Sequence, residues 1–184
     1  MRDDIKPLPS AERLVGLLTY DPDTGSLKWL PRGTIPPSRG DRMFNSKHAG
    51  KNAGTVGKSG YLTVCIRERG EKFKTYYAHR LIWKMVLDVD PDQIDHVDGD
   101  RLNNAWDNLR AASNGKNIQN SKRRKDNKSG VKGVCWDVRR KKWRVVISAD
   151  GVHYRLGRFS TLAAAAAAIM AERDRLHGEF ARHQ

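Results

Sequence analysis

One segment, IDHVDGDRLNNAWDNLR at residues 94–110, decides the fold at the centre of this chain. Its opening residues predict a short strand, and the run of Asp, Gly and Asn that follows is typical of a loop. A polar helix is expected to begin after the loop, near Trp106 or near Ser113. Because adjacent residues of a strand point to opposite faces, Asp95 and His96 would present a carboxylate and an imidazole on its two sides.

The polar residues in and after this segment suit the hydrolysis of a phosphodiester. That reaction needs a cation that neutralises the phosphate and the leaving 3′ oxygen, and a base that takes a proton from water. Imidazole is such a base, and carboxylate and amide oxygens favour Mg²⁺ or Mn²⁺ over zinc. The candidates are Asp95, His96, Asn108 and Asn117. Each residue by itself is more typical of a structural role in a strand, a turn or an exposed helix.

The charge of the chain indicates a polyanionic partner. Its 184 residues include 35 Lys and Arg against 21 Asp and Glu, a formal net charge of +14. Residues 121–184 hold 16 basic and 6 acidic residues, whereas residues 61–120 hold 9 of each, with an acidic cluster between Asp88 and Asp100. The surplus favours a nucleic acid as partner, and the acidic cluster fits a site for a cation.

Composition excludes other classes of protein. No apolar run approaches the roughly 20 residues that span a bilayer, and the N-terminus carries acids and Pro where a secretory signal has its apolar core. Cys65 and Cys135 lie 70 positions apart with no CxxC pairing, which argues against a disulfide scaffold and a thiolate zinc site. We expect an intracellular protein outside the membrane, and nothing in the sequence indicates an obligatory protein partner.

Upstream of the central segment, the pattern predicts helices and hairpins. Residues 9–18 are expected to form a helix with Ser10 as its N-cap, and residues 19–30 a hairpin around Asp-Pro-Asp-Thr-Gly. Residues 31–59 are rich in Pro, Gly, Ser and Lys and are predicted to be loop with short strand pieces. Two alternating strands are expected within residues 60–78, followed by a helix, HRLIWKMVL.

Downstream, a basic linker leads to three predicted strands and the run TLAAAAAAIMAERDRLHG, the strongest helix in the chain. Ser160 or Thr161 would cap this helix, and Gly178 would end it. The helix is expected to cover the sheet face made by Trp143, Val145, Ile147, Tyr154 and Leu156. The other face would carry Arg144, Val146, Ser148, His153 and Arg155. Such a ribbon fits the major groove of DNA, and the composition equally fits a basic, solvated face without sequence preference.

As a whole, residues 79–121 resemble the HNH nuclease module, the ββα-metal fold of phage homing and free-standing endonucleases. The resemblance is carried by IDHVDGDRLNN, DNLR and NGKNIQNS. It implies that His96 is the general base, that Asp95 and Asn117 hold a divalent metal, and that Asn108 ties the loop down so that the imidazole is aimed. Asn117 stands where many relatives carry His, so the motif becomes H-N-N.

The C-terminal segment, from VKGVCWDV to the Ala-rich helix, resembles the DNA-binding domain of plant ethylene-response (Apetala-type) transcription factors. The KGV opening, the aromatic-led second strand and the LGRF segment carry this resemblance. In that family Arg and Trp side chains of the three strands contact DNA. The resemblance assigns this role to Lys132, Trp136, Arg139, Arg144 and Arg155. Arg123 and Arg124 of the linker are further candidates, while Cys135 and Ser148 stand where that family carries Arg.

The N-terminal residues also look like the leader of phage HNH proteins, with YDPDTGSLKW followed by an SGYLTV strand. This resemblance implies an accessory DNA contact or packing against the nuclease. His79 either bonds to the backbone of the metal strand or is a buried structural histidine.

These predictions together give an α+β chain, with a small ββα-metal nuclease centre followed by a three-stranded antiparallel sheet packed on one helix. The expected segments are an accessory region (1–60), the nuclease (61–121), a basic linker (122–130) and a DNA-binding domain (131–184). The expected function is hydrolysis of double-stranded DNA with Mg²⁺ or Mn²⁺, by a phage or mobile-element protein in the cytoplasm of a bacterial host. The alternative is a non-catalytic, sequence-specific DNA-binding regulator. In a third interpretation, the linker is a localisation or RNA-binding patch.

Overall fold

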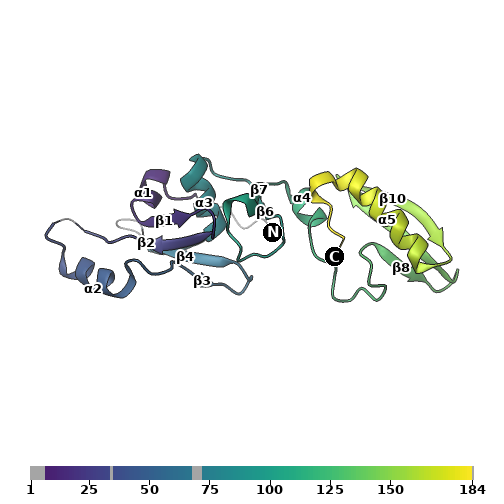
Figure 1. Cartoon of the computed structure of the whole chain (residues 1–184), viewed down its shortest axis with the longest axis horizontal. Coiled ribbons are helices and arrows are strands. Elements are labelled where there is room, and N and C mark those ends of the chain that lie inside the picture. The colour runs from purple at the N-terminus through teal and green to yellow at the C-terminus, as the bar shows by residue number, and fades with distance from the viewer. Residues whose placement is uncertain (1–6, 34, 68–71, 184) are drawn as a thin grey trace. The chain divides into compact units, whose positions relative to one another are not determined.

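The computed structural model describes residues 7–33, 35–67 and 72–183. The chain divides into two compact units, Met1–Ala111 and Ala112–Gln184, each of which is described here by itself (Figure 1). Both combine helices with antiparallel strands, which confirms the predicted α+β class. None of the helices in the described ranges has the length and apolar character needed to cross a bilayer.

Unit 1 is built from short helices and small antiparallel sheets. In chain order its elements are α1 (Ala11–Val15), β1 (Leu18–Asp21), β2 (Ser26–Trp29), α2 (Arg39–His48), β3 (Thr55–Val56), β4 (Leu62–Arg67), β5 (Phe73–Tyr77), α3 (Ala78–Leu87), β6 (Ile94–His96), the 3-10 turn η1 (Trp106–Asn108) and β7 (Leu109–Ala111). The strands pair as β1–β2, as β3–β4–β5 and as β6–β7.

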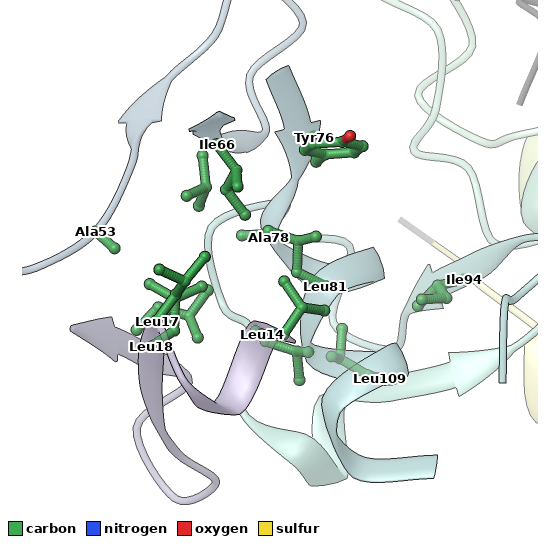
Figure 2. Packing of buried hydrophobic residues seen from close by; sticks show 13 residues of the cluster. Leu14, Leu17, Leu18, Ala53, Ile66, Tyr76, Ala78, Leu81, Ile94 and Leu109 are labelled. Atoms are coloured by element: carbon green, nitrogen blue, oxygen red, sulfur yellow. The ribbon is translucent and has the colours of Figure 1, made fainter. Parts of the chain in front are cut away.

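One hydrophobic cluster holds the elements of unit 1 together (Figure 2). Leu14 of α1 packs in it with Leu81 and Ile82 of α3, and all three side chains have no exposed area. Ile94 of β6 and Leu109 of β7 belong to the same cluster. The N-terminal segment therefore forms part of the core that carries the central strands.

Residues 31–59, predicted to be loop with strand pieces, contain the ten-residue helix α2 as well as the short strand β3. Ser38 caps the helix: its hydroxyl accepts from the Asp41 backbone N–H, and the Asp41 carboxylate accepts from the Ser38 backbone N–H. This reciprocal capping box is a sequence signal for the start of a helix. The prediction for this stretch was wrong because it relied on the Pro and Gly residues around the helix and not on the capping box.

Unit 2 contains one sheet and a long helix. Its elements are α4 (Asn114–Gln119), β8 (Val134–Asp137), β9 (Lys142–Ala149), β10 (Val152–Phe159), α5 (Leu162–His177) and the 3-10 turn η2 (Gly178–Phe180). The antiparallel sheet has the order β10–β9–β8. Thr161 caps α5 by accepting from the Ala164 backbone N–H, and α5 ends at Gly178, as predicted.

The long helix covers one face of this sheet. Val145 and Ile147 of β9 are buried against Ala165 and Ile169 of α5. The predicted partners on the same face, Trp143, Tyr154 and Leu156, pack against this cluster. The alternation along β9 therefore assigned the two faces of the sheet correctly.

Candidate active site

Strands β6 and β7 form the ribbon that carries the candidate residues. Asp95 lies opposite Arg110, and His96 lies opposite Leu109. The Asp95 and His96 residues are only 8% and 4% exposed, respectively. Because neighbouring residues of a strand alternate between faces, the carboxylate and the imidazole leave the ribbon on different sides. The predicted strand is confirmed.

Arg110 fixes the carboxylate of Asp95. Its Nε and Nη2 atoms donate to Asp95 Oδ2 at 3.0 and 2.8 Å. Both side chains are largely buried, so water screens this ion pair weakly. Arg110 was not among the residues predicted from the sequence; the signal that would have identified it is the register of the ribbon, in which directly opposite residues share a face.

Asn104 holds the imidazole of His96. The Asn104 residue is 1% exposed, and its Nδ2 donates to the carbonyl oxygen of Leu102 at 3.1 Å. This bond leaves Asn104 Oδ1 facing His96 Nε2 at 3.2 Å. An amide oxygen only accepts, so Nε2 carries the proton and Nδ1 keeps the lone pair that a base needs. Burial lowers the pKa of His96, although the bond to Asn104 and the nearby carboxylates oppose the shift.

Asn108 ties down the loop between the two strands. Its Oδ1 accepts from the Asp98 backbone N–H at 3.0 Å, and its Nδ2 donates to Asp98 Oδ1 at 2.9 Å and to the Asn103 carbonyl oxygen at 2.7 Å. The loop-tying part of its predicted role agrees with these contacts. Asn104, which was predicted only as a loop residue, is the amide whose Oδ1 lies 3.2 Å from the imidazole Nε2.

A cluster of rings surrounds His96. The His79 ring lies edge-on to the His96 ring with centroids 5.2 Å apart, and it stacks on Tyr77 at 5.5 Å and an interplanar angle of 10°. Tyr61 lies 5.1 Å from the His79 ring and 5.9 Å from the His96 ring. Burial, with the charges of His96 and Arg80, lowers the pKa of His79 to about 3. His79 is therefore a buried, neutral ring at neutral pH.

The N-terminal hairpin supports the same loop. Tyr20 of β1 donates its hydroxyl to the Asn104 carbonyl oxygen at 2.9 Å, and the Trp106 N–H donates to the Pro22 carbonyl oxygen at 2.8 Å. Gly25 has a φ of +71°, and a Cβ there would lie 2.3 Å from the Ala105 nitrogen. The turn of the hairpin thus packs directly against the residues that orient His96.

Comparison with known proteins identifies this segment. A family model described as HNH endonuclease matches residues 76–118, from the end of β5 into α4. Protein 3.8 of Escherichia phage T7 is 37% identical over 118 residues, which make up 61% of this chain and 97% of that protein. The chain belongs to the HNH endonuclease family. A solved structure of DNA binding and cleavage by the HNH homing endonuclease I-HmuI resembles it with 20% identity and a TM-score of 0.42, covering 92% of this chain and 90% of that one.

The Asp95 carboxylate of this HNH endonuclease suits a hard divalent cation. It lies in unit 1, whereas Asn117 lies in α4, which belongs to unit 2. Within the described ranges, three or more His, Cys, Asp or Glu side chains nowhere gather in an arrangement that holds a metal. A Mg²⁺ ion typically takes only one or two protein carboxylates and completes its shell with water and phosphate oxygens, so a single carboxylate fits such an ion.

The predicted DNA contacts of the HNH endonuclease divide between the two faces of the C-terminal sheet. Cys135 pairs with Arg144, and Trp136 pairs with Trp143, so Trp136 shares the helix-covered face with Trp143. The two indole rings lie 4.9 Å apart. Arg144 and Arg155 are exposed on the other face. Trp136 and Arg144 therefore cannot contact one DNA groove through the same sheet face.

Lys132 points inward. Its Nζ donates to the carbonyl oxygens of Gln119, at 2.8 Å, and of Ser121. Burial, with the charges of Arg173 and Arg182, lowers its pKa to about 8. Lys132 fastens the end of α4 to the start of the sheet domain, which gives it a use other than the predicted DNA contact. Exposed side chains among the other predicted contacts are those of Arg123, Arg124 and Arg139.

Proposed function

We propose that this protein is a metal-dependent DNA endonuclease in which His96 activates the water that attacks the phosphodiester. One observation carries the proposal. Within the segment matched by the family model, His96 is buried with its Nε2 held by Asn104, beside an Asp95 carboxylate held by Arg110. This arrangement provides a preorganised base next to an oriented hard ligand, which is what hydrolysis of a phosphodiester requires.

The chain's own residues set up the proton transfer. Since burial lowers the pKa of His96, its imidazole is neutral at neutral pH and accepts the proton of water at Nδ1. The water oxygen forms a bond to phosphorus while the bond from phosphorus to the 3′ oxygen breaks. Asn104 keeps Nε2 protonated and the ring in place, so the imidazolium that forms still donates to an oriented amide oxygen.

Asp95 and Asn117 would hold the divalent cation, Mg²⁺ or Mn²⁺. When bound, the metal neutralises the phosphate and the leaving oxygen. Arg110 directs the Asp95 carboxylate by donating twice to Oδ2. Neither residue offers a thiolate or an imidazole, the soft and borderline ligands that select zinc and copper, so hard cations are favoured.

Double-stranded DNA is the proposed substrate, with the C-terminal domain positioning the cut. The exposed Arg144 and Arg155 face of the sheet is suited to a groove, and Arg123, Arg124 and Arg139 are suited to phosphates. The role follows the resemblance of this domain to ethylene-response DNA-binding domains. The phage relative supports action in the cytoplasm of a bacterial host.

Cleavage of plasmid DNA tests this function. Wild-type protein is compared with His96→Ala and with the matched control His183→Ala, a histidine near the C-terminus, in Mg²⁺, Mn²⁺ and EDTA. We expect cleavage by the wild type and the control with either metal, none in EDTA, and none by His96→Ala. Cleavage by His96→Ala at the wild-type rate would contradict the assignment. Tight, specific binding without cleavage would favour the DNA-binding regulator instead.

Asn104→Ala examines the orientation of the base separately. Loss of a group that orients a reactive imidazole typically lowers activity by about 10- to 100-fold. The control is Asn103→Ala, which removes a neighbouring amide of the same loop that donates to Asp98 instead of holding His96. An Asn104→Ala rate no lower than that of Asn103→Ala would remove Asn104 from the mechanism.

A further inference from the structure

Helix α2 is exposed on one face and packed on the other, yet it buries no residue fully. Its inward face carries Asp41, Phe44, Asn45 and His48, all of them half-buried. A ten-residue helix with so little apolar burial is marginal by itself in water. Specific polar contacts must therefore hold it in place.

Those contacts join the inward face to the chain before the helix. The Arg32 backbone N–H donates to Asn45 Oδ1 at 2.8 Å, and Asn45 Nδ2 donates to the Arg32 carbonyl oxygen at 2.9 Å. The Arg32 guanidinium lies 3.5 Å from the Phe44 ring centroid and 5.3 Å from that of Trp29. With the capping box of Ser38, these contacts fix the orientation of a helix that adds little to the core.

The outward face is cationic. Arg39, Arg42 and Lys47 are exposed there, and none of the three takes part in an ion pair with any described residue. The acidic residue of the helix, Asp41, lies on the inward face and is used by the cap. At a rise of about 1.5 Å per residue, the cations span about 12 Å of one helix face.

We propose that the outward face of α2 binds the phosphate backbone of the duplex that the enzyme cuts. This inference rests on the proposed endonuclease function, because it needs DNA to be the substrate. Within unit 1, Figure 1 places α2 away from β6 and β7, so this contact extends the DNA footprint to one side of the cut. Charge complementarity selects the partner: the face presents cations that form no ion pair with a described residue, one of which, Arg42, donates to the Pro37 carbonyl oxygen at 2.8 Å. Duplex DNA carries a phosphate charge about every 1.7 Å of its axis.

The same face argues against a membrane as the partner. A helix that lies in a bilayer interface carries a broad apolar face with Trp, Phe or Leu opposite its cations. The exposed apolar side chain of α2 is that of Met43, which is 65% exposed, whereas the Phe44 ring is covered by the Arg32 guanidinium. The outward face of α2 therefore carries exposed cations and lacks the broad apolar face with which a helix inserts into a bilayer interface.

Binding of the full-length protein to duplex DNA in EDTA tests the proposal without cleavage. The variant Arg39→Gln/Arg42→Gln/Lys47→Gln removes the charges while keeping residues that favour a helix. The control Arg39→Lys/Arg42→Lys keeps them. Fluorescence anisotropy across a salt series should show that the Gln variant binds more weakly and that its salt slope is shallower by about 2.7, or about 0.9 per lost phosphate contact. The Lys control should match the wild type.

A second arm locates the contact. Duplexes are shortened from either side of the cut, and the advantage of the wild type over the Gln variant should disappear when one flank is removed. Equal affinity and equal salt slope for the wild type and the Gln variant would overturn the proposal, as would an advantage that persists on duplexes shortened from both sides. A wild type that shows the α2 effect in binding but never cleaves DNA would contradict the endonuclease function alone.

Discussion

The two units bury polar side chains for different purposes. In unit 1, two buried side chains are held by other side chains: His96 meets Asn104, and Asp95 meets Arg110. In unit 2, two buried side chains reach backbone carbonyl groups: Arg173 Nη2 donates to the Lys132 carbonyl oxygen at 2.6 Å, while its Nη1 lies 3.3 Å from His183 Nδ1, and His177 lies 3.0 Å from the Ser148 carbonyl oxygen.

Under the proposed function, this difference separates a reactive centre from a scaffold. Polar side chains that orient other side chains leave a reactive atom in a defined direction, which is what a preorganised site needs. Polar side chains that hydrogen-bond to backbone carbonyl groups hold segments of the chain together. The charged side chains of unit 2 that are not used in this way are exposed on its surface.

The largest effect is expected from the buried imidazole of unit 1. The folded pKa of His79 is about 3 against 6.5 when unfolded, so between these values the unfolded chain binds a proton that the folded chain excludes. Stability should therefore fall as the pH falls from 6.5 toward 3. His79→Phe keeps a ring beside Tyr77 without a titrating group, and between pH 6.5 and 3.5 it should lose about 3.5 kcal/mol of this acid dependence. Urea unfolding of both proteins at pH 6.5 and 3.5 checks it; identical pH dependence would contradict it.

The packing of the N-terminal hairpin on the His96 loop gives the next largest effect. Gly25→Ala places a Cβ 2.3 Å from the Asn104 carbonyl carbon, at a φ of +71°. The substitution should lower the free energy of unfolding by about 3 kcal/mol and should also reduce cleavage activity.

Gly50→Ala is the matched control for this change. Gly50 has a φ of +74° but open space around its Cβ position, so the substitution should cost only about 1 kcal/mol and leave cleavage intact. Chemical denaturation and plasmid cleavage measure both effects. Equal losses in the two variants would mean that the hairpin does not support the active site.

The smallest effect is expected on the open face of unit 2. Arg144→Gln/Arg155→Gln should weaken binding to duplex DNA and make the salt dependence of the binding constant shallower by about 2. The variant should raise Kd and leave the cleavage rate at saturating DNA unchanged. Arg175→Gln is the control, because Arg175 lies on α5 and pairs with Glu172. Anisotropy titrations at several salt concentrations measure the slope. A control that weakens binding as much as the double variant would show that the sheet face has no special role.

Sequence alone predicted the elements whose pattern is local. The strand with Asp95 and His96 and the two faces of β9 follow from alternation within a few residues, whereas the loop-tying role of Asn108 was implied by the resemblance to the HNH module. Helix α2 was missed, although Ser38 and Asp41 form a local capping box, because the prediction relied on composition there.

Contacts between residues that lie far apart in the sequence could not be predicted from local patterns. Tyr20 lies 84 positions from Asn104, and nothing in either neighbourhood indicates their hydrogen bond. The same holds for Lys132, to which the resemblance to ethylene-response domains assigned a DNA contact but whose ammonium group donates to carbonyl oxygens at the end of α4.

The sequence by itself therefore determined which groups can do chemistry, because residue type and strand period fix a carboxylate, an imidazole and their opposite directions. The tertiary structure decided which nitrogen of His96 faces the amide of Asn104 and which charges face outward. Those outcomes depend on the amide of Asn104, the hairpin around Gly25 and the burial of Lys132, and only folding brings such distant groups within hydrogen-bonding distance.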